Sequence, residues 1–325
     1  MVWRKVLLAC LLVQAWTTSI LLAQEAPRDQ RMCVVLGAAG ESQYGEAFRT
    51  WGSRWQQAAS DFDFTMIDGT DDAQTGDTLA HRDAIMQWIS RADPSVREHW
   101  LIFIGHGTHD AKTTRFNLKG PDISAIDLGK SLNGKPGKWV LIFCSSASAP
   151  FLSAVSGADR VVITATKSGS EENYSRFGDF LSQSLSDDQA DMDHDRTVSV
   201  LELFLAASRR VEKYYTEQSL LATEQSLLDD NGDGRGTPAV FYRGVRAVKA
   251  PAEGASLDGE AARRIVLSRN GPSLSRENED RIAAIESAIE VLRSKKTDMD
   301  IDSYYDELEK LLVQLAGYLQ QNQNP

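Results

Sequence analysis

Two short apolar segments of the chain end in residues whose side chains are suited to nucleophilic chemistry. The first, residues 101–105, is followed by His106 and Gly107, and the second, residues 139–143, is followed by Cys-Ser-Ser at 144–146. An imidazole can take the proton of a thiol or hydroxyl, which then attacks a carbonyl carbon. Backbone N–H groups near Gly107 and the nucleophile would stabilise the resulting oxyanion. These residue types therefore indicate acyl transfer, for example hydrolysis of a peptide bond.

Short apolar segments alternate with longer amphipathic ones from Cys33 onward. The short segments predict buried strands and the amphipathic ones predict helices. The predicted strands cover residues 33–36, 62–67, 100–104, 139–143 and 160–164, and the predicted helices cover 41–59, 78–92, 124–132, 177–185 and 200–215. This alternation requires right-handed crossovers, so the expected fold class is α/β with a mostly parallel sheet flanked by helices. His106 and residues 144–146 would then lie at one edge of the sheet, where parallel strands end.

The two strand ends resemble the catalytic elements of legumain- and caspase-type peptidases. In this superfamily a His-Gly pair follows one strand, and the nucleophilic Cys follows the next strand within a segment of polar residue, small residue, Cys, any residue, Ser and Gly. His106 and Gly107 match the first element. The resemblance spans about residues 32–185 and implies a legumain/caspase-like sheet and a cysteine-type endopeptidase site.

The second element departs from the superfamily pattern, and two registers fit it. In the first, Cys144 takes the polar position, Ser145 the small one and Ser146 the place of the nucleophile. Ser-Ala at 148–149 then stands for Ser-Gly. In the second register Cys144 is the nucleophile, but the bulky Phe143 then occupies the site of a small residue. The first register is favoured because a large ring before the nucleophile would crowd a tight turn.

The two registers require different catalytic machinery. A thiol ionises readily beside an imidazolium, whereas a hydroxyl needs a base within hydrogen-bond reach that is itself oriented by a third group. Legumain also uses an Asn after its first strand to hold the histidine, and the matching residues 37–41 (Gly-Ala-Ala-Gly-Glu) offer no amide. The resemblance therefore implies the fold more strongly than the activity. His106 has both a catalytic and a structural interpretation.

Residues 191–202 carry oxygen-bearing side chains at a regular spacing. Positions 1, 3, 5, 7, 9 and 12 of this segment are filled by Asp191, Asp193, Asp195, Thr197, Ser199 and Glu202. Oxygen ligands at this spacing converge on one hard cation, and the segment resembles the EF-hand loop that binds Ca²⁺. Arg196 stands where glycine usually permits the sharp turn, at a cost on the order of 1 kcal/mol. Calcium is therefore the expected cofactor.

A second acidic segment, residues 229–234 (Asp-Asp-Asn-Gly-Asp-Gly), matches the same loop in part. Asp229, Asn231 and Asp233 occupy positions 1, 3 and 5, but position 12 is Val240. Both a polar turn and a weak cation site fit this composition. Either acidic segment suits a calcium-rich exterior, where flexible modules bind Ca²⁺ with Kd near ~10⁻⁴ to 10⁻³ M.

The composition predicts an exported protein that avoids nucleic acids. Residues 1–23 place two basic residues before a diluted apolar run that ends in Ala23, which indicates an export signal or, alternatively, an uncleaved anchor. The whole chain has a formal net charge of −11, which disfavours nucleic-acid binding and attracts cations. We expect a periplasmic, cell-envelope or extracellular location, with no membrane association beyond the N-terminal segment.

The sequence patterns divide the chain into four parts. An α/β domain over residues 32–249, which includes the acidic loop, follows the signal at 1–23. A linker rich in Ala, Gly, Pro and charge is predicted over 250–272, and an antiparallel helical hairpin over 273–321. The hairpin is predicted from apolar residues at helical spacing, namely Ile282, Ile285, Ile289, Leu292, Leu308, Leu312, Leu315 and Leu319. Its outer faces either pack within the chain or bind a protein partner or a second copy.

Three functions are compatible with these features. The favoured one is a catalytically degenerate peptidase-fold protein that binds a peptide or protein ligand and holds structural calcium. The second is an active endopeptidase in which His106 assists Cys144 or Ser146. The third is a calcium-dependent structural or sensor protein.

Overall fold

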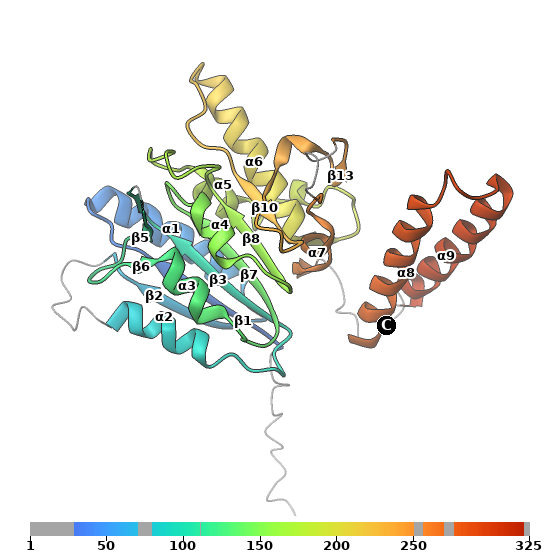
Figure 1. Ribbon diagram of the computed structural model, residues 1–325, viewed down its shortest axis with the longest axis horizontal. Helices are drawn as coiled ribbons and strands as arrows, with labels where there is room; N and C mark the ends of the chain where they lie inside the picture. The colour runs from blue at the N-terminus through green and yellow to red at the C-terminus, as the bar shows by residue number, and fades with distance from the viewer. Residues whose placement is uncertain (1–28, 71–79, 111, 250–255, 270–275, 322–325) are drawn as a thin grey trace, which may run out of the picture.

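The computed structural model describes residues 29–70, 80–110, 112–249, 256–269 and 276–321 (Figure 1). The predicted export signal at 1–23 lies outside these ranges. Within them, no helix combines the length and the apolar character that a bilayer crossing requires.

A seven-stranded sheet forms the centre of the molecule, in the order β11-β10-β8-β7-β3-β1-β2. Five neighbouring strands run parallel, and these are β2 (Asp63–Asp68), β1 (Gln30–Leu36), β3 (Glu98–Ile104), β7 (Lys138–Cys144) and β8 (Arg160–Thr164). Two short strands, β10 (Leu227–Asp229) and β11 (Thr237–Pro238), extend the β8 side in antiparallel orientation. The predicted α/β class with a mostly parallel sheet is therefore confirmed, and the five predicted strands are its parallel part.

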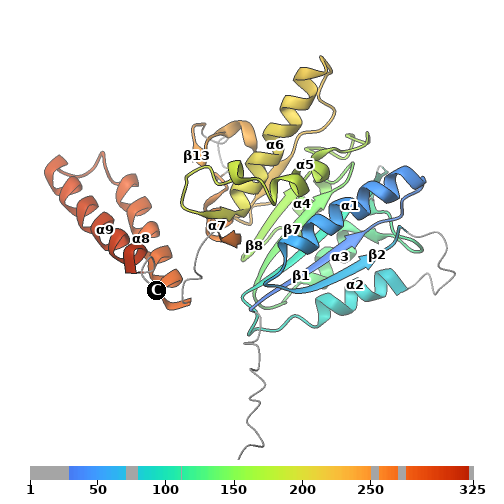
Figure 2. The same cartoon turned by 180° about the vertical axis from the view of Figure 1, so that it is seen from behind.

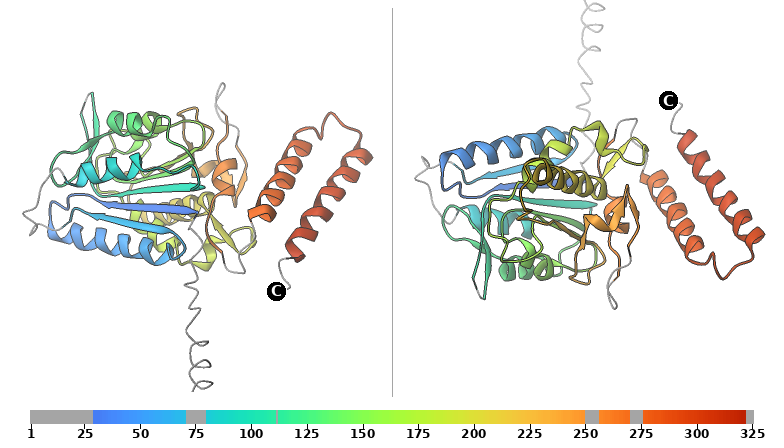
Figure 3. Two further views of the ribbon diagram at one scale, coloured as in Figure 1. Left: turned by 90° about the horizontal axis from the view of Figure 1, so that it is seen from below. Right: turned by 90° about the horizontal axis from the view of Figure 1, so that it is seen from above.

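Helices cover both faces of the sheet (Figures 1 and 3). One face packs against α1 (Ser42–Ala58), α5 (Phe177–Ser184) and α6 (Val200–Glu217). The other packs against α2 (Ala80–Ser90), α3 (Ala125–Leu132) and α4 (Ala149–Val155). Alternate residues of one strand enter opposite cores: Val34 lies in the α1 core and Val35 in the α2 core. Burial on both faces explains why these strands are continuous apolar runs in the sequence.

Short strands form three smaller sheets around the central one. β4 (Gly107–His109), β5 (Thr114–Phe116) and β6 (Ile123–Ser124) make an antiparallel sheet directly after β3. β12 (Tyr242–Arg243) pairs with β13 (Arg246–Ala247), after the 3₁₀ turn η2 (Ala239–Phe241). β9 (Thr197–Ser199), which follows the 3₁₀ turn η1 (Asp188–Ala190), pairs with β14 (Val266–Arg269). The first of these sheets carries Gly107, and the last carries part of the acidic loop.

The segment predicted to be a linker differs from that expectation where the structure describes it. Residues 256–269 contain α7 (Glu260–Arg264) and β14, and Ala262, Ile265 and Leu267 are buried in the α1-side core. These apolar residues are few and lie among Gly, Ala and charged residues, so no helical or alternating period was evident. Packing against α6 and pairing with β9, rather than local propensity, give this segment its structure.

Helices α8 (Arg276–Ser294) and α9 (Ile301–Gln321) lie side by side at one end of the molecule (Figures 1 and 2). Ile285, Ile289 and Leu292 are buried, as is Tyr304 on the facing helix. Val313 of α9 is 66% exposed. The role of this outer surface in binding a partner or a second copy stays a prediction.

A close contact between α5 and the sheet can be tested at Gly178. A Cβ at this position would lie 2.7 Å from Cys144 Cβ and 2.9 Å from the Trp51 ring. We expect Gly178→Ala to lower the free energy of unfolding by about 1–3 kcal/mol, because the added methyl overpacks this core. The matched control is Gly317→Ala in α9, where a Cβ meets nothing within 4 Å. That variant should gain up to about 1 kcal/mol from helix propensity. Chemical denaturation measures both, and an equal effect of the two would contradict the contact.

Candidate functional site

The parallel pairing of β3 with β7 brings the two predicted catalytic segments together. Ile104 is the register partner of Cys144, so both strands end at the same level of the sheet. His106 and Gly107 leave β3 at this edge, and Ser146 leaves β7 beside them. The expectation that the two segments share one edge of the sheet is met in the structure.

The His106 ring is half-buried in an aromatic setting. Its centroid lies 4.9 Å from that of Tyr44 and 5.2 Å from that of Phe48, with both contacts edge-on. Burial lowers the pKa of His106, and the Ala39 carbonyl and the charge of Glu41 oppose this shift. The imidazole is therefore neutral to lower pH than a free histidine.

A backbone carbonyl holds the histidine in place. His106 Nε2 lies 3.2 Å from the carbonyl oxygen of Ala39, in the loop after β1. Because a carbonyl only accepts hydrogen bonds, Nε2 must carry the proton, and Nδ1 is left as the basic nitrogen. The sequence offers no amide side chain in this loop to hold the histidine. The orienting group belongs to the main chain, which no residue type reveals.

The Ser146 hydroxyl is hydrogen-bonded to the residue that follows the histidine. Ser146 Oγ donates to the Gly107 carbonyl over 3.1 Å and accepts from the Gly107 N–H over 3.4 Å. Among the described residues, no hydrogen bond joins this hydroxyl to the His106 ring. The approach is close enough that a Cβ at position 107 would lie 2.3 Å from the Ser146 carbonyl oxygen. Only glycine fits at this position without displacement of the loop.

Cys144 lies inside the core and not in the site. It is 1% exposed, and its side chain packs toward Gly178 of α5. Burial raises the pKa of the Cys144 thiol far above its usual range, and the nearby charge of Glu224 adds to this effect. The register that makes Cys144 the nucleophile therefore has no support from its surroundings.

Glu224 is a buried carboxylate near the site that sequence reasoning did not single out. It is 3% exposed and accepts hydrogen bonds from Ser175 Oγ at 2.6 Å, from the Arg176 N–H at 2.9 Å and from the Phe177 N–H at 3.2 Å. A carboxylate at this place satisfies the free N–H groups that begin α5. Its role is structural, since it fixes the helix that covers Cys144.

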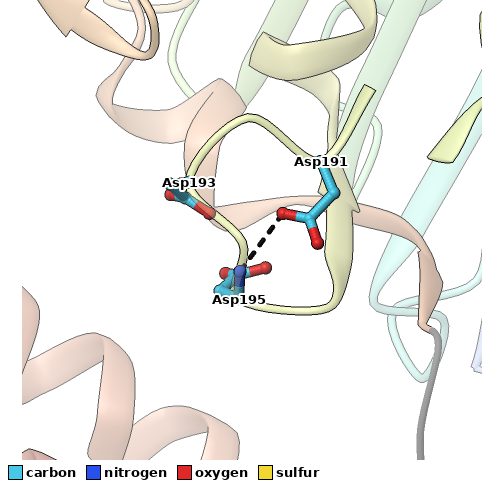
Figure 4. Close-up of side chains that lie close together, drawn as sticks. All are labelled: Asp191, Asp193 and Asp195. Carbon is cyan, nitrogen blue, oxygen red and sulfur yellow. Dashed lines mark hydrogen bonds between the residues drawn. The ribbon is translucent and has the colours of Figure 1, made fainter. Parts of the chain in front are cut away.

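The acidic loop brings three of its predicted ligands together. Carboxylate oxygens of Asp191, Asp193 and Asp195 lie within 4.8 Å of one another (Figure 4). Asp191 Oδ1 accepts the Asp195 N–H over 3.1 Å, which closes the turn. Arg196 takes the left-handed backbone conformation that was expected to be costly, with φ +71°, and His194 has φ +60°. The loop therefore has the shape of a cation site despite the missing glycine.

The remaining predicted ligands follow the three aspartates, and the Thr197 hydroxyl donates to Asp195 Oδ1 at 2.7 Å. Thr197 and Ser199 belong to β9, and α6 begins directly after them. Both Glu202 oxygens accept hydrogen bonds from the loop: Oε1 from the Met192 N–H at 2.8 Å, and Oε2 from the Ser199 hydroxyl at 2.8 Å. Burial raises the pKa of Glu202, and these hydrogen bonds oppose the shift. Glu202 is thus fixed against the loop as part of the capping box of α6 and is not one of the three carboxylates that lie within 4.8 Å of one another.

Comparisons with known protein families and with curated proteins find no match to this chain. The function of the site is therefore inferred from its geometry and its chemistry.

Burial of Cys144 makes a prediction about thiol reactivity. Iodoacetamide should leave Cys144 unmodified in the native protein from pH 7 to pH 9, because the raised pKa and the burial both suppress the reactive thiolate. Cys33, whose pKa burial raises to about 12, is the internal control and should behave alike. Peptide mass spectrometry after labelling measures both sites, with denatured protein as the reference for full modification. Rapid native labelling of Cys144 that His106→Ala abolishes would instead identify Cys144 as an activated nucleophile.

Proposed function

We propose that the chain is an exported α/β protein of the legumain- and caspase-like class, that its peptidase machinery is degenerate, and that it acts by binding a peptide or protein segment. Two features support the class: a His-Gly pair after β3 and a small polar segment after the neighbouring parallel strand β7. Similarity of fold is an analogy, and activity depends on the site itself. The N-terminal segment predicted as a signal supports export.

The hydrogen bonds of Ser146 are the main support for the proposal that the peptidase machinery is degenerate. A serine nucleophile must transfer its only proton to a base, but this hydroxyl donates its hydrogen bond to the Gly107 carbonyl, which is not a base. An oxyanion needs free N–H donors, but the Gly107 N–H points at Ser146 Oγ. The same short contact thus uses both the proton and the donor that acyl transfer would require.

The surroundings of the histidine favour binding of a ligand. Tyr44 and Tyr174 are half-buried, with ring centroids 5.1 Å apart, and both lie against His106. Half-buried tyrosines offer a flat apolar surface together with a hydroxyl, which suits a side chain of a bound peptide.

The active endopeptidase remains the second candidate, because the Ala39 carbonyl orients His106 as a base requires. A single experiment separates the two. We expect peptides selected from a random library by the wild-type protein to remain intact after incubation, as shown by mass spectrometry. Ser146→Ala should bind them with unchanged affinity, whereas Tyr44→Ala should weaken binding about tenfold or more, the loss expected for a buried aromatic contact.

The control variant for this experiment is Tyr305→Ala, which removes an exposed tyrosine of α9. It should bind like the wild type. Cleavage of the peptides by the wild type, lost in both Ser146→Ala and His106→Ala, would show an endopeptidase and overturn the proposal.

We also propose that the loop at 191–202 binds Ca²⁺. Support comes from the three convergent aspartates and from the turn conformation at His194 and Arg196. A structural role is favoured over a sensor role because Glu202 and β9 already hold the loop against α6 and β14.

Calcium should stabilise the protein through this loop. At a concentration about 100 times Kd, one site adds about 2.7 kcal/mol to the free energy of unfolding. Asp191→Asn should lose a gain of this size, because it removes a ligand charge, whereas Asp188→Asn in the adjacent turn should keep it. Thermal unfolding with calcium or with chelator measures the difference. Equal gains in the two variants would contradict the site, and a large change in circular dichroism on binding would favour a sensor.

A further inference from the structure

The second acidic segment is completed by a residue from a distant part of the chain. Asp258 Oδ1 accepts the N–H groups of Asp230 at 2.9 Å and Asn231 at 3.3 Å, which are positions 2 and 3 of this loop. Asp258 Oδ2 accepts the hydroxyl of Thr237, position 9, at 2.6 Å. The segment therefore does have an acidic residue against it, although Val240 occupies position 12.

The same three contacts occur in the first loop, where Glu202 makes them. Glu202 Oε1 accepts the N–H groups at positions 2 and 3, Met192 at 2.8 Å and Asp193 at 3.4 Å. Glu202 Oε2 accepts the hydroxyl of Ser199, position 9, at 2.8 Å. Asp258 thus has the hydrogen-bonding role in the second loop that the position-12 acid has in the first.

The main chain of the two loops also turns alike. Gly232 and Gly234, at positions 4 and 6 of the second loop, have φ +78° and +73°, and the same positions of the first loop are also left-handed. In the second loop the N–H of Arg235, position 7, donates to Asp233 Oδ1, position 5, at 2.8 Å. The first loop has the same bond between positions 7 and 5, at 2.7 Å. The similarity therefore extends from side chains to the backbone.

An unpartnered carboxylate oxygen at the start of the second loop indicates a missing ligand. Asp229 is 1% exposed, and its Oδ1 accepts the Gly232 N–H at 3.1 Å, so the carboxyl faces the loop. Its Oδ2 has no partner at hydrogen-bonding distance among the described residues. A buried, unpaired carboxylate is costly. Among the described residues, neither Asp229 nor Asp258 forms an ion pair.

We propose that the second loop and Asp258 form a further binding site for a hard divalent cation of the size of calcium. The oxygen donors would be the side chains of Asp229, Asn231 and Asp233, at positions 1, 3 and 5, while Asp258 would hold the loop as Glu202 holds the first one. Carboxylate and amide oxygens are the ligands that Ca²⁺ prefers, and the cation would supply the partner that Asp229 Oδ2 lacks. This site is separate from the loop at 191–202 and does not depend on it.

The number of calcium ions bound tests the site. Isothermal titration calorimetry with calcium chloride on the full chain, stripped with chelator, should find two ions in the wild type. Asp229→Asn, Asp258→Asn and Asp191→Asn should each bind one ion, and Asp229→Asn combined with Asp191→Asn should bind none.

Asp230→Asn is the matched control within the same loop. Asp230 is at position 2, which is not a ligand position of the EF-hand loop, and its carboxylate accepts the N–H groups of Gly259 at 2.9 Å and Ala262 at 2.8 Å instead. This variant should therefore still bind two ions, although its thermal unfolding in chelator shifts to lower temperature. Circular dichroism in chelator checks that each variant is folded, and Asp229→Asn should fold well, because it removes an uncompensated buried charge.

The outcomes distinguish this site from the first loop. One ion in the wild type that Asp229→Asn removes and Asp191→Asn leaves would support the second site and overturn the first. One ion that Asp191→Asn removes and both Asp229→Asn and Asp258→Asn leave would overturn the second site alone. No binding at millimolar calcium would overturn both.

Discussion

The pairing register of β3 and β7 is the constraint on which the site depends. Side chains of a strand alternate between the two faces of the sheet, so a slip of one residue would move every side chain of that strand to the opposite face. In the observed register Ile104 and Cys144 are partners, and both face the core under α1 and α5. Two residues further along, His106 and Ser146 leave the sheet together. The register that buries the Cys144 thiol in the core therefore also places the Ser146 hydroxyl next to residues 106–107.

The close approach of Gly107 to Ser146 decides what the edge of the sheet can do. The glycine has no Cβ to hold the two loops apart, and its N–H and carbonyl both meet one hydroxyl. A thiolate at this place would repel the carbonyl and turn toward an imidazolium, whereas a neutral hydroxyl forms both hydrogen bonds at once. A hydroxyl at position 146 can therefore engage both backbone groups of Gly107 at once.

The sequence was sufficient to predict the parallel strands and the main helices, because residues buried on both faces form continuous apolar runs. The size of Phe143 favoured Ser146 over Cys144, and the structure buries Cys144 in the core, but the role of Ser146 as a nucleophile stays a prediction. It could not show the short strands β10 and β14, whose few residues carry no period. Nor could it show the Ala39 carbonyl or the contact of Asp258 with residues 230–231, since a main-chain atom has no residue type and a long-range pairing leaves no local pattern.

The segment of residues 258–269, which contains α7 and β14, contacts both acidic loops. At one end Asp258 is fixed to residues 230–231, and at the other β14 is hydrogen-bonded to β9. Between these points, Arg263 forms an ion pair with Asp193. One short segment therefore contacts both acidic loops, so a substitution that unfolds α7 or β14 would remove contacts from each of them.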